Sequence, residues 1–166
     1  MNESASSVTR RTFFAAGGLG ALAAVAASRL AAAQELKSVS ADVEKSNIRV
    51  VNDFCASLKS RDVAKATSLI ADNCVYRPSQ TSTRPPVVGR EAVVERVKGF
   101  MDRGAEFKVL KTTAFGPLVL NERDDIFAKG FGDGPSNAGP QTFRVAAGLF
   151  YVENGKIVEW TDYLVR

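Results

Sequence analysis

Residues 142–165, TFRVAAGLFYVENGKIVEWTDYLV, form the stretch that decides the fold. Its two parts, 142–152 and 156–165, have the period of two that predicts β-strands. Between them stands Asn154-Gly155, and Asn-Gly is the strongest short signal of a two-residue hairpin turn. The stretch therefore predicts two antiparallel strands joined by a tight turn.

More strands are expected upstream of this hairpin. The period of two continues through residues 107–115 and 117–128. The Gly-rich segment 129–141 predicts a long hairpin loop. A short strand is expected over 74–77, and it ends at Pro78 because proline cannot donate a hydrogen bond to a neighbouring strand.

Three helices are expected before most of these strands. Apolar residues recur at helical spacing over 41–58, 63–70 and 90–101. Asp72-Asn73 predicts a turn after the second helix. Helices followed by a run of antiparallel strands indicate the α+β class, with helices packed on one face of a curved sheet. Such a sheet forms a cone with a pocket at its open end.

The first residues have the features of an export signal. Arg10-Arg11 precedes a mildly apolar run over 15–27, and Ala31-Ala32-Ala33 offers a cleavage site. Twin arginines indicate the bacterial twin-arginine export machinery, and so a periplasmic or secreted protein. A membrane anchor is the alternative, although the run is short for a bilayer core about 30 Å thick. The expected organisation is a signal peptide over 1–33, a flexible lead-in over 34–40, and one domain over 41–166.

Charge argues against a nucleic-acid partner. Three arginines and one glutamate lie in residues 1–33, so the remainder carries 19 basic and 17 acidic residues. These charges are interleaved along the chain rather than gathered in a basic stripe. The composition therefore predicts no nucleic-acid binding.

The chain contains no histidine, which restricts its chemistry. Nucleophile systems that depend on histidine and most zinc sites are excluded. Acid–base catalysis near neutral pH would need carboxylates, Lys, Tyr or Cys with shifted pKa. No phosphate-binding Gly-rich loop, metal-ligand cluster or CxxC motif is visible, so no cofactor is expected. Cys55 and Cys74 could form a disulfide in an oxidising compartment, or could be two small buried side chains.

The most informative strand is 117–128, because charged residues alternate with apolar ones. One face carries Val119, Asn121, Arg123, Asp125 and Phe127. Both faces are mixed, so alternation leaves open whether this face is inside. If it is inside, Arg123 and Asp125 must pair, because a buried unpaired charge is costly. If it is outside, they form ordinary surface ion pairs.

A second carboxylate stands on the last strand. Val158, Trp160, Asp162 and Leu164 share one face, which is apolar apart from Asp162. A carboxylate on an apolar face is typical of a desolvated functional acid. Tyr76 on the first strand could point into the same pocket. An arginine between two carboxylates could hold them in different protonation states.

These segments resemble limonene epoxide hydrolases. The resemblance is carried by Glu122-Arg123-Asp124-Asp125, by Gly148-Leu149-Phe150 with the following turn, and by Trp160-Thr161-Asp162-Tyr163. It extends over about residues 46–163. That family lies within the nuclear-transport-factor-2-like superfamily, with ketosteroid isomerases and polyketide cyclases.

The resemblance implies a cone-shaped curved mixed sheet, or α+β barrel, whose helices enclose an apolar pocket. It also implies a homodimer and one-step opening of a small lipophilic epoxide to a vicinal diol, without a cofactor. In this chain Asp162 would be the general base, Asp125 the general acid, Arg123 the bridge between them, and Tyr76 a holder of the attacking water. We expect the substrate pocket to be lined by Trp160, Phe127, Leu149 and Phe54.

One departure from the family pattern leaves other functions open. Pro78 stands where the family has a water-holding asparagine, and Ser79 or Asn121 could substitute for it. A binding protein for an apolar small molecule is one alternative, and a proton-transfer isomerase or cyclase is another.

Overall fold

The predicted hairpin is present in the computed structural model of the chain. Strand β5 (Gln141–Glu153) runs antiparallel to β6 (Lys156–Leu164). Asn154 and Gly155, which join them, adopt φ angles of 50° and 73°. A hairpin turn of type I′ needs positive φ at both central positions, and Asn-Gly accepts this at low cost.

The structure describes residues 40–79, 82–130 and 139–164. The expected signal peptide and lead-in lie outside this range except for Ser40, which is already helical. Most of the predicted Gly-rich loop also lies outside it. Among the described helices, none combines the length and the apolar character needed to cross a bilayer.

Six strands form one mixed sheet in the order β2-β1-β6-β5-β4-β3. The other four strands are β1 (Ile70–Arg77), β2 (Val87–Val88), β3 (Ala105–Phe115) and β4 (Leu118–Phe127). Only β1 and β6 run parallel, and every other neighbouring pair is antiparallel. The expected α+β fold with a curved mixed sheet is therefore confirmed.

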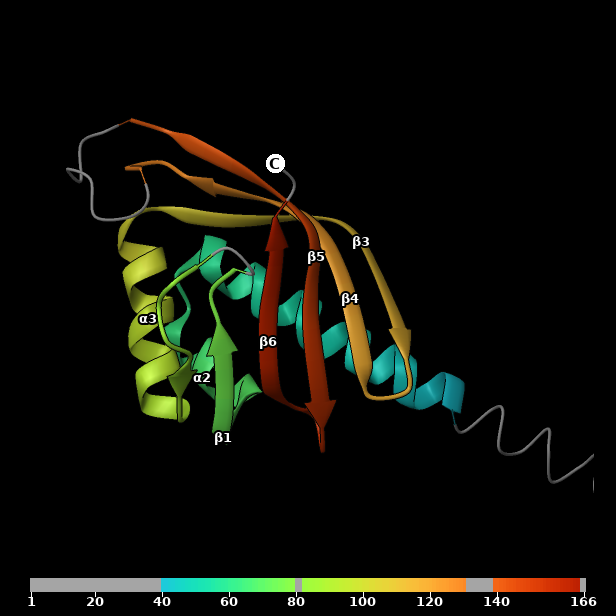
Figure 1. The fold of residues 1–166 in the computed structure, drawn as a ribbon. Helices are drawn as coiled ribbons and strands as arrows, with labels where there is room; N and C mark the ends of the chain where they lie inside the picture. The colour runs from blue at the N-terminus through green and yellow to red at the C-terminus, as the bar shows by residue number, and fades with distance from the viewer. Residues whose placement is uncertain (1–39, 80–81, 131–138, 165–166) are drawn as a thin grey trace, which may run out of the picture. The chain divides into compact units, whose positions relative to one another are not determined.

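Irregular registers bend the sheet. In β3, Leu110 is an extra residue, because Val109 pairs with Arg123 and Lys111 pairs with Glu122. The pairing of β4 with β5 shifts between Asn121 and Arg123 in the same region. Bulges bend a strand and increase its twist. Figure 1 shows β3, β4 and β5 bending over toward α3.

Three helices lie on one side of this sheet (Figure 1). The first is described over residues 40–60, and α2 (Val63–Leu69) and α3 (Arg90–Asp102) follow. The α2 helix begins where expected because the Asp62 carboxylate accepts a hydrogen bond of 2.8 Å from the Lys65 backbone N–H. That bond satisfies a donor that a helix start leaves without a partner.

Aromatic side chains fill the core between the helices and the sheet. Trp160 is their centre, with its ring centroid 5.3 Å from Phe54, 5.7 Å from Phe150 and 4.1 Å from Tyr76. Phe100 and Phe107 also contact it. Edge-on and offset ring pairs of this kind add to the stabilisation from apolar burial.

Two local expectations were wrong. Asp72 and Asn73 do not form a turn, since β1 begins directly after α2 and runs through both residues. Val158 does not share the inner face with Trp160 as expected. An extra residue in β6 shifts the alternation there, because Val152 pairs with Ile157 while Tyr151 pairs with Glu159. Ile157 is consequently buried in the core, and Val158 is not part of it.

Candidate active site

The site is organised around Arg123, whose side chain is fully buried. Strand β4 places it on the inner face, in the alternating pattern that buries Val119, Asn121, Asp125 and Phe127 as well. The question that alternation left open is thereby answered: this face is inside.

Two carboxylates hold the Arg123 guanidinium. Its Nε donates to Asp125 Oδ1 at 2.7 Å, and its Nη2 contacts Asp125 Oδ2 at 3.3 Å. The same Nη2 donates to Asp162 Oδ1 at 2.7 Å. A third contact runs from Nη1 to the Asn121 side-chain oxygen at 3.4 Å. Burial of this cation is tolerated because both carboxylates face it directly.

The contact between Arg123 and Asp162 crosses a whole strand. Arg123 lies on β4 and Asp162 on β6, with β5 between them. Strands two places apart in a sheet are separated by about 10 Å. Gly148 of β5 pairs with Asn121 on one side and with Asp162 on the other. The guanidinium therefore passes over the one residue of β5 that has no side chain.

No side chain fits at position 148. A Cβ built on Gly148 would lie 2.0 Å from Arg123 Nη1 and 3.0 Å from a ring carbon of Phe150. An isolated glycine inside a strand is a known sign of close approach by another group. The sequence carries that sign at Gly148, which is not among the predicted site residues.

Aromatic rings enclose the cation on its remaining sides. The Arg123 guanidinium carbon lies 4.5 Å from the centre of the Phe107 ring. It is 5.8 Å from the ring centres of both Phe150 and Trp160. The negative faces of such rings attract a desolvated cation. Burial alone would lower the pKa of Arg123, but Asp162 and Asp125 outweigh burial and raise it.

The two carboxylates have different surroundings. Burial raises the pKa of Asp125 to about 6, and Asp162 adds to this rise, whereas Arg123 opposes it. Asp162 Oδ1 accepts a second hydrogen bond of 2.7 Å from Trp160 Nε1. Both donors to Asp162, Arg123 Nη2 and Trp160 Nε1, therefore meet on a single oxygen. Asp125 is a carboxyl group that keeps its proton to a higher pH than an ordinary aspartate.

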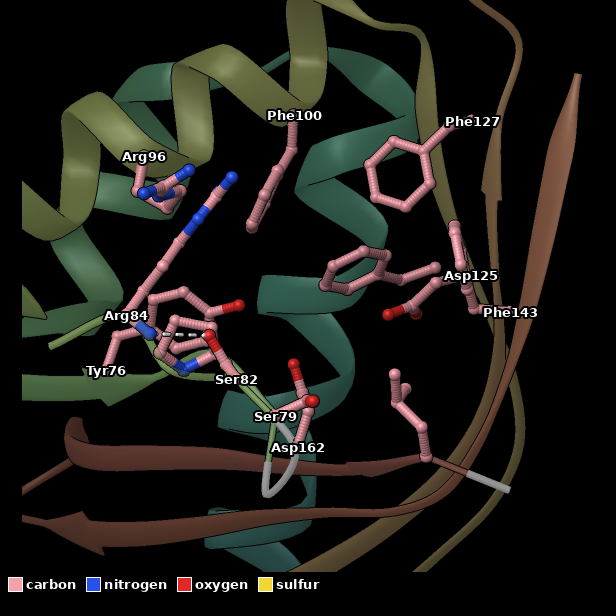
Figure 2. A pocket seen from close by; sticks show the side chains of 13 residues that line it. Tyr76, Ser79, Ser82, Arg84, Arg96, Phe100, Asp125, Phe127, Phe143 and Asp162 are labelled. Carbon is pink, nitrogen blue, oxygen red and sulfur yellow. Dashed lines mark hydrogen bonds between the residues drawn. The ribbon is translucent and has the colours of Figure 1, made fainter. Parts of the chain in front are cut away.

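The pocket beside these carboxylates is a cavity of about 180 Å³. Asp125 and Asp162 line it together with Tyr76 (Figure 2). The other lining residues are Pro78, Ser79, Ser82, Arg84, Arg96, Phe100, Phe107, Phe127, Phe143 and Leu164. Four phenylalanines and a leucine make the wall mostly apolar, which suits a lipophilic ligand.

Tyr76 is the third predicted catalytic residue that lines this pocket, whereas Arg123 is buried behind Asp125 and Asp162. Figure 2 shows its hydroxyl directed into the pocket. Burial, and then the charge of Asp162, raise the pKa of Tyr76 above its usual range. The hydroxyl therefore stays protonated and can donate a hydrogen bond.

Three predicted pocket residues do not line it. Phe54 and Trp160 lie behind the wall, fully buried in the core. Leu149 pairs with Leu120 on the other face of the sheet, because β5 turns Gly148 and Phe150 inward. Phe127 is the only one of the four predicted residues that lines the pocket.

Of the two interpretations of the cysteines, the disulfide is not found, since Cys55 and Cys74 are both free and buried. The Cys55 thiol faces the Asn121 side-chain oxygen at 3.8 Å. Burial raises the pKa of both thiols to about 12, so they remain protonated. They act as small buried side chains, which was the alternative interpretation.

The two substitutes considered for the missing asparagine occupy different places. Ser79 lines the pocket beside Pro78. Asn121 is not among the lining residues. Its amide nitrogen donates to Thr112 Oγ1 at 2.8 Å, and its side-chain oxygen contacts Arg123. Ser79 alone is therefore placed to meet a water in the pocket. Over residues 40–79, 82–130 and 139–164, no group of three metal-binding side chains is found.

Comparisons with known proteins show a family for this chain. The limonene-1,2-epoxide hydrolase catalytic domain family matches residues 45–165. A solved LEH-like epoxide hydrolase of M. tuberculosis has 25% identity and a TM-score of 0.60, over 74% of this chain and 84% of that one. No curated protein gave a match.

Two structures of lower sequence identity show how widely the fold is shared. A structure from Jannaschia sp. that is described as a SnoaL-like polyketide cyclase has 15% identity and a TM-score of 0.63, over 74% of this chain and 87% of that one. A structure from Kribbella flavida that is described as a ketosteroid isomerase has 16% identity and a TM-score of 0.57, over 74% of this chain and 80% of that one. At such identities only the fold is shared.

The crossing of β5 by Arg123 makes a prediction about Gly148. Gly148→Ala is expected to destabilise the fold by about 3 kcal/mol or more, because its methyl group overlaps a buried, paired guanidinium. Chemical unfolding monitored by tryptophan fluorescence measures this loss. Gly99→Ala is the matched control, since nothing lies within 4 Å of its added Cβ on helix α3. It should stabilise the fold by about 0.5–1 kcal/mol. Equal stability of the two variants would contradict the crossing.

Proposed function

Since the chain belongs to the limonene-1,2-epoxide hydrolase catalytic domain family, we propose that it opens a lipophilic epoxide to a vicinal diol by direct addition of water. The observation that carries the proposal is the buried set Asp125, Arg123 and Asp162, in which one guanidinium nitrogen contacts both carboxylates. A hydrolysis of this kind needs one base and one acid at the same time, and the raised pKa of Asp125 suits that residue to be the acid.

Asp162 is the proposed base. Its Oδ1 is occupied by Arg123 and Trp160, whereas within the described residues its Oδ2 accepts no hydrogen bond. The residue lines the pocket, so Oδ2 can take a proton from a water there. Tyr76 and Ser79 line the same cavity, and their hydroxyl groups can orient that water. Pro78 cannot do so through its side chain.

Asp125 is the proposed acid. As the water oxygen forms its bond to an epoxide carbon, the bond from that carbon to the epoxide oxygen breaks. Asp125 gives its proton to that oxygen while Asp162 receives a proton from the water. The product is a diol, and all atoms of the water end in the diol or on Asp162.

The total charge of Arg123 and the two carboxylates is the same before and after this step, because one carboxylate gains a proton while the other loses one. Before it, the positive guanidinium faces an ionised Asp162 and a neutral Asp125. After it, Asp162 is neutral and Asp125 is ionised, with the same cation between them. The negative charge therefore moves across one guanidinium without an uncompensated charge in the core. A proton passing from Asp162 to Asp125 through pocket water restores the starting state.

The proposal extends to location and assembly. The twin arginines and the apolar run of residues 1–33 support export through the bacterial twin-arginine machinery to the periplasm or beyond. The family resemblance supports a homodimer as the working form.

The second candidate function is a binding protein that holds an apolar molecule without converting it. Pro78 in the pocket wall favours it, because a water-holding side chain is missing there. In that case ligands would bind with equal strength to the parent protein and to Asp125→Asn.

Asp162→Asn and Asp125→Asn each test the proposed hydrolysis. Each is expected to lower diol formation from small lipophilic epoxides by about 10²–10⁴-fold, because the loss removes the base or the acid. Gas chromatography of the products measures the rate. Asp124→Asn is the control, because Asp124 lies next in β4 on the other face and pairs with Arg144. It should retain most of the activity. Diol formation at the parent rate by Asp162→Asn would refute the assignment of the base.

The pH dependence tests the acid. Asp125 is protonated below its pKa of about 6 and ionised above it. We therefore expect kcat/KM to fall as pH rises through about 6, by about tenfold per pH unit on the basic side. Initial rates at low substrate concentration, with circular dichroism to verify folding, provide the profile. A rate that increases through this range would show that Asp125 works in its ionised form.

A further inference from the structure

The charged groups of the pocket fall into two sets at different ends. Asp125 and Asp162 lie at one end, where the proposed chemistry occurs. Figure 2 shows Arg84 and Arg96 reaching the other end, near α3. The labelled phenylalanines run from Phe100, on the side of Arg96, to Phe127 and Phe143, on the side of Asp125. The proposed hydrolysis uses the carboxylates and leaves these two arginines without a role.

Arg96 is the more informative of the two, because no described residue forms an ion pair with it. It lies in α3 and is partly buried in the pocket wall. Within the described part of the chain it forms no ion pair and donates no hydrogen bond. The nearest acid along its own helix, Glu95, pairs with Lys98 instead. Asp125 and Asp162 are held by Arg123.

Arg84 adds a second positive charge to the same end of the pocket. It comes from the segment after Ser82, whose hydroxyl accepts a hydrogen bond of 3.1 Å from the Arg84 backbone N–H. Its side chain lines the cavity beside Arg96, so a ligand anion bound by Arg96 would lie near a second guanidinium. Guanidinium groups also bind a carboxylate through two parallel hydrogen bonds.

The wall between the ends suits an apolar spacer. Phe100 packs against Phe127 with ring centroids 5.8 Å apart, and Phe127 packs against Phe143 at 6.1 Å. These rings offer no charge to the ligand. A molecule that satisfies both ends would therefore have an anionic group, an apolar body and an epoxide.

We propose that the substrate of this site is a lipophilic epoxide that carries a carboxylate, bound by Arg96 with Arg84 beside it. This inference rests on the proposed hydrolysis and adds the class of substrate to it. The carboxylate end anchors at α3, the apolar body lies along the phenylalanines, and the epoxide lies between Asp125 and Asp162.

The kinetic test compares one medium-chain epoxide as its free acid and as its methyl ester, below the concentrations at which micelles form. Arg96→Gln is expected to raise KM for the acid by about 10–100-fold and to leave kcat nearly unchanged, because a charge-assisted hydrogen bond is lost. Its kinetics on the ester should not change. Lys98→Gln, on the same helix but outside the pocket, is the control and should match the parent on both. An equal effect of Arg96→Gln on acid and ester would overturn the inference and leave the hydrolysis standing.

A binding experiment separates this inference from the proposed hydrolysis. The probes are a saturated carboxylic acid of the same chain length and its methyl ester, neither of which can react. Trp160 is the only tryptophan and lies directly behind Tyr76 of the pocket wall, so its fluorescence reports binding. We expect the acid to bind the parent protein at least tenfold more tightly than the ester, and Arg96→Gln to remove that difference. This result would support the inference even if no epoxide were hydrolysed. Equal binding of acid and ester to the parent protein would overturn it.

Discussion

One buried cation organises this protein. Arg123 has no exposed surface, and it is tolerated there only because Asp125 and Asp162 face it and aromatic rings surround it. Removing one partner of a buried ion pair costs about 3–5 kcal/mol, since the other charge is left uncompensated. The arrangement also dictates features at a distance. Strand β5 needs a glycine where the guanidinium crosses, and β4 and β6 must keep one register relative to β5 so that the two carboxylates meet the same nitrogen.

The same constraint gives the site its proposed chemistry. Two carboxylates that share a guanidinium cannot be treated as independent acids, because the charge on one affects the other. Their surroundings differ: Asp162 accepts a second hydrogen bond from Trp160, whereas burial raises the pKa of Asp125 to about 6. Arg96 is the opposite case. It is a cation in the same pocket whose charge the described residues do not compensate, and a ligand is the natural source of the missing charge.

Much of the fold was predictable because its signals are local. The Asn154-Gly155 turn, the Asp62 helix start and the alternation in β4 depend on neighbours in sequence. What could not be predicted depends on pairing between distant segments. The extra residue in β6 buries Ile157, and the inward turn of Gly148 sends Leu149 to the outer face. The grouping of Asp125, Arg123 and Asp162 was expected from a family resemblance. The position of Arg96, at the edge of an apolar helix face, gave no sign that it lines the pocket.

The central claim is that Asp125 holds a proton while Asp162 is ionised across the same guanidinium. Nuclear magnetic resonance of protein labelled with ¹³C at the aspartate carboxyl carbons measures this directly, with Asp125→Asn and Asp162→Asn to assign the signals. We predict a signal that titrates with a midpoint near pH 6 and is absent from Asp125→Asn. At pH 5 that signal should have the chemical shift of a carboxylic acid, and the Asp162 signal that of a carboxylate. An ionised Asp125 at pH 5, or a protonated Asp162 beside it, would contradict the claim.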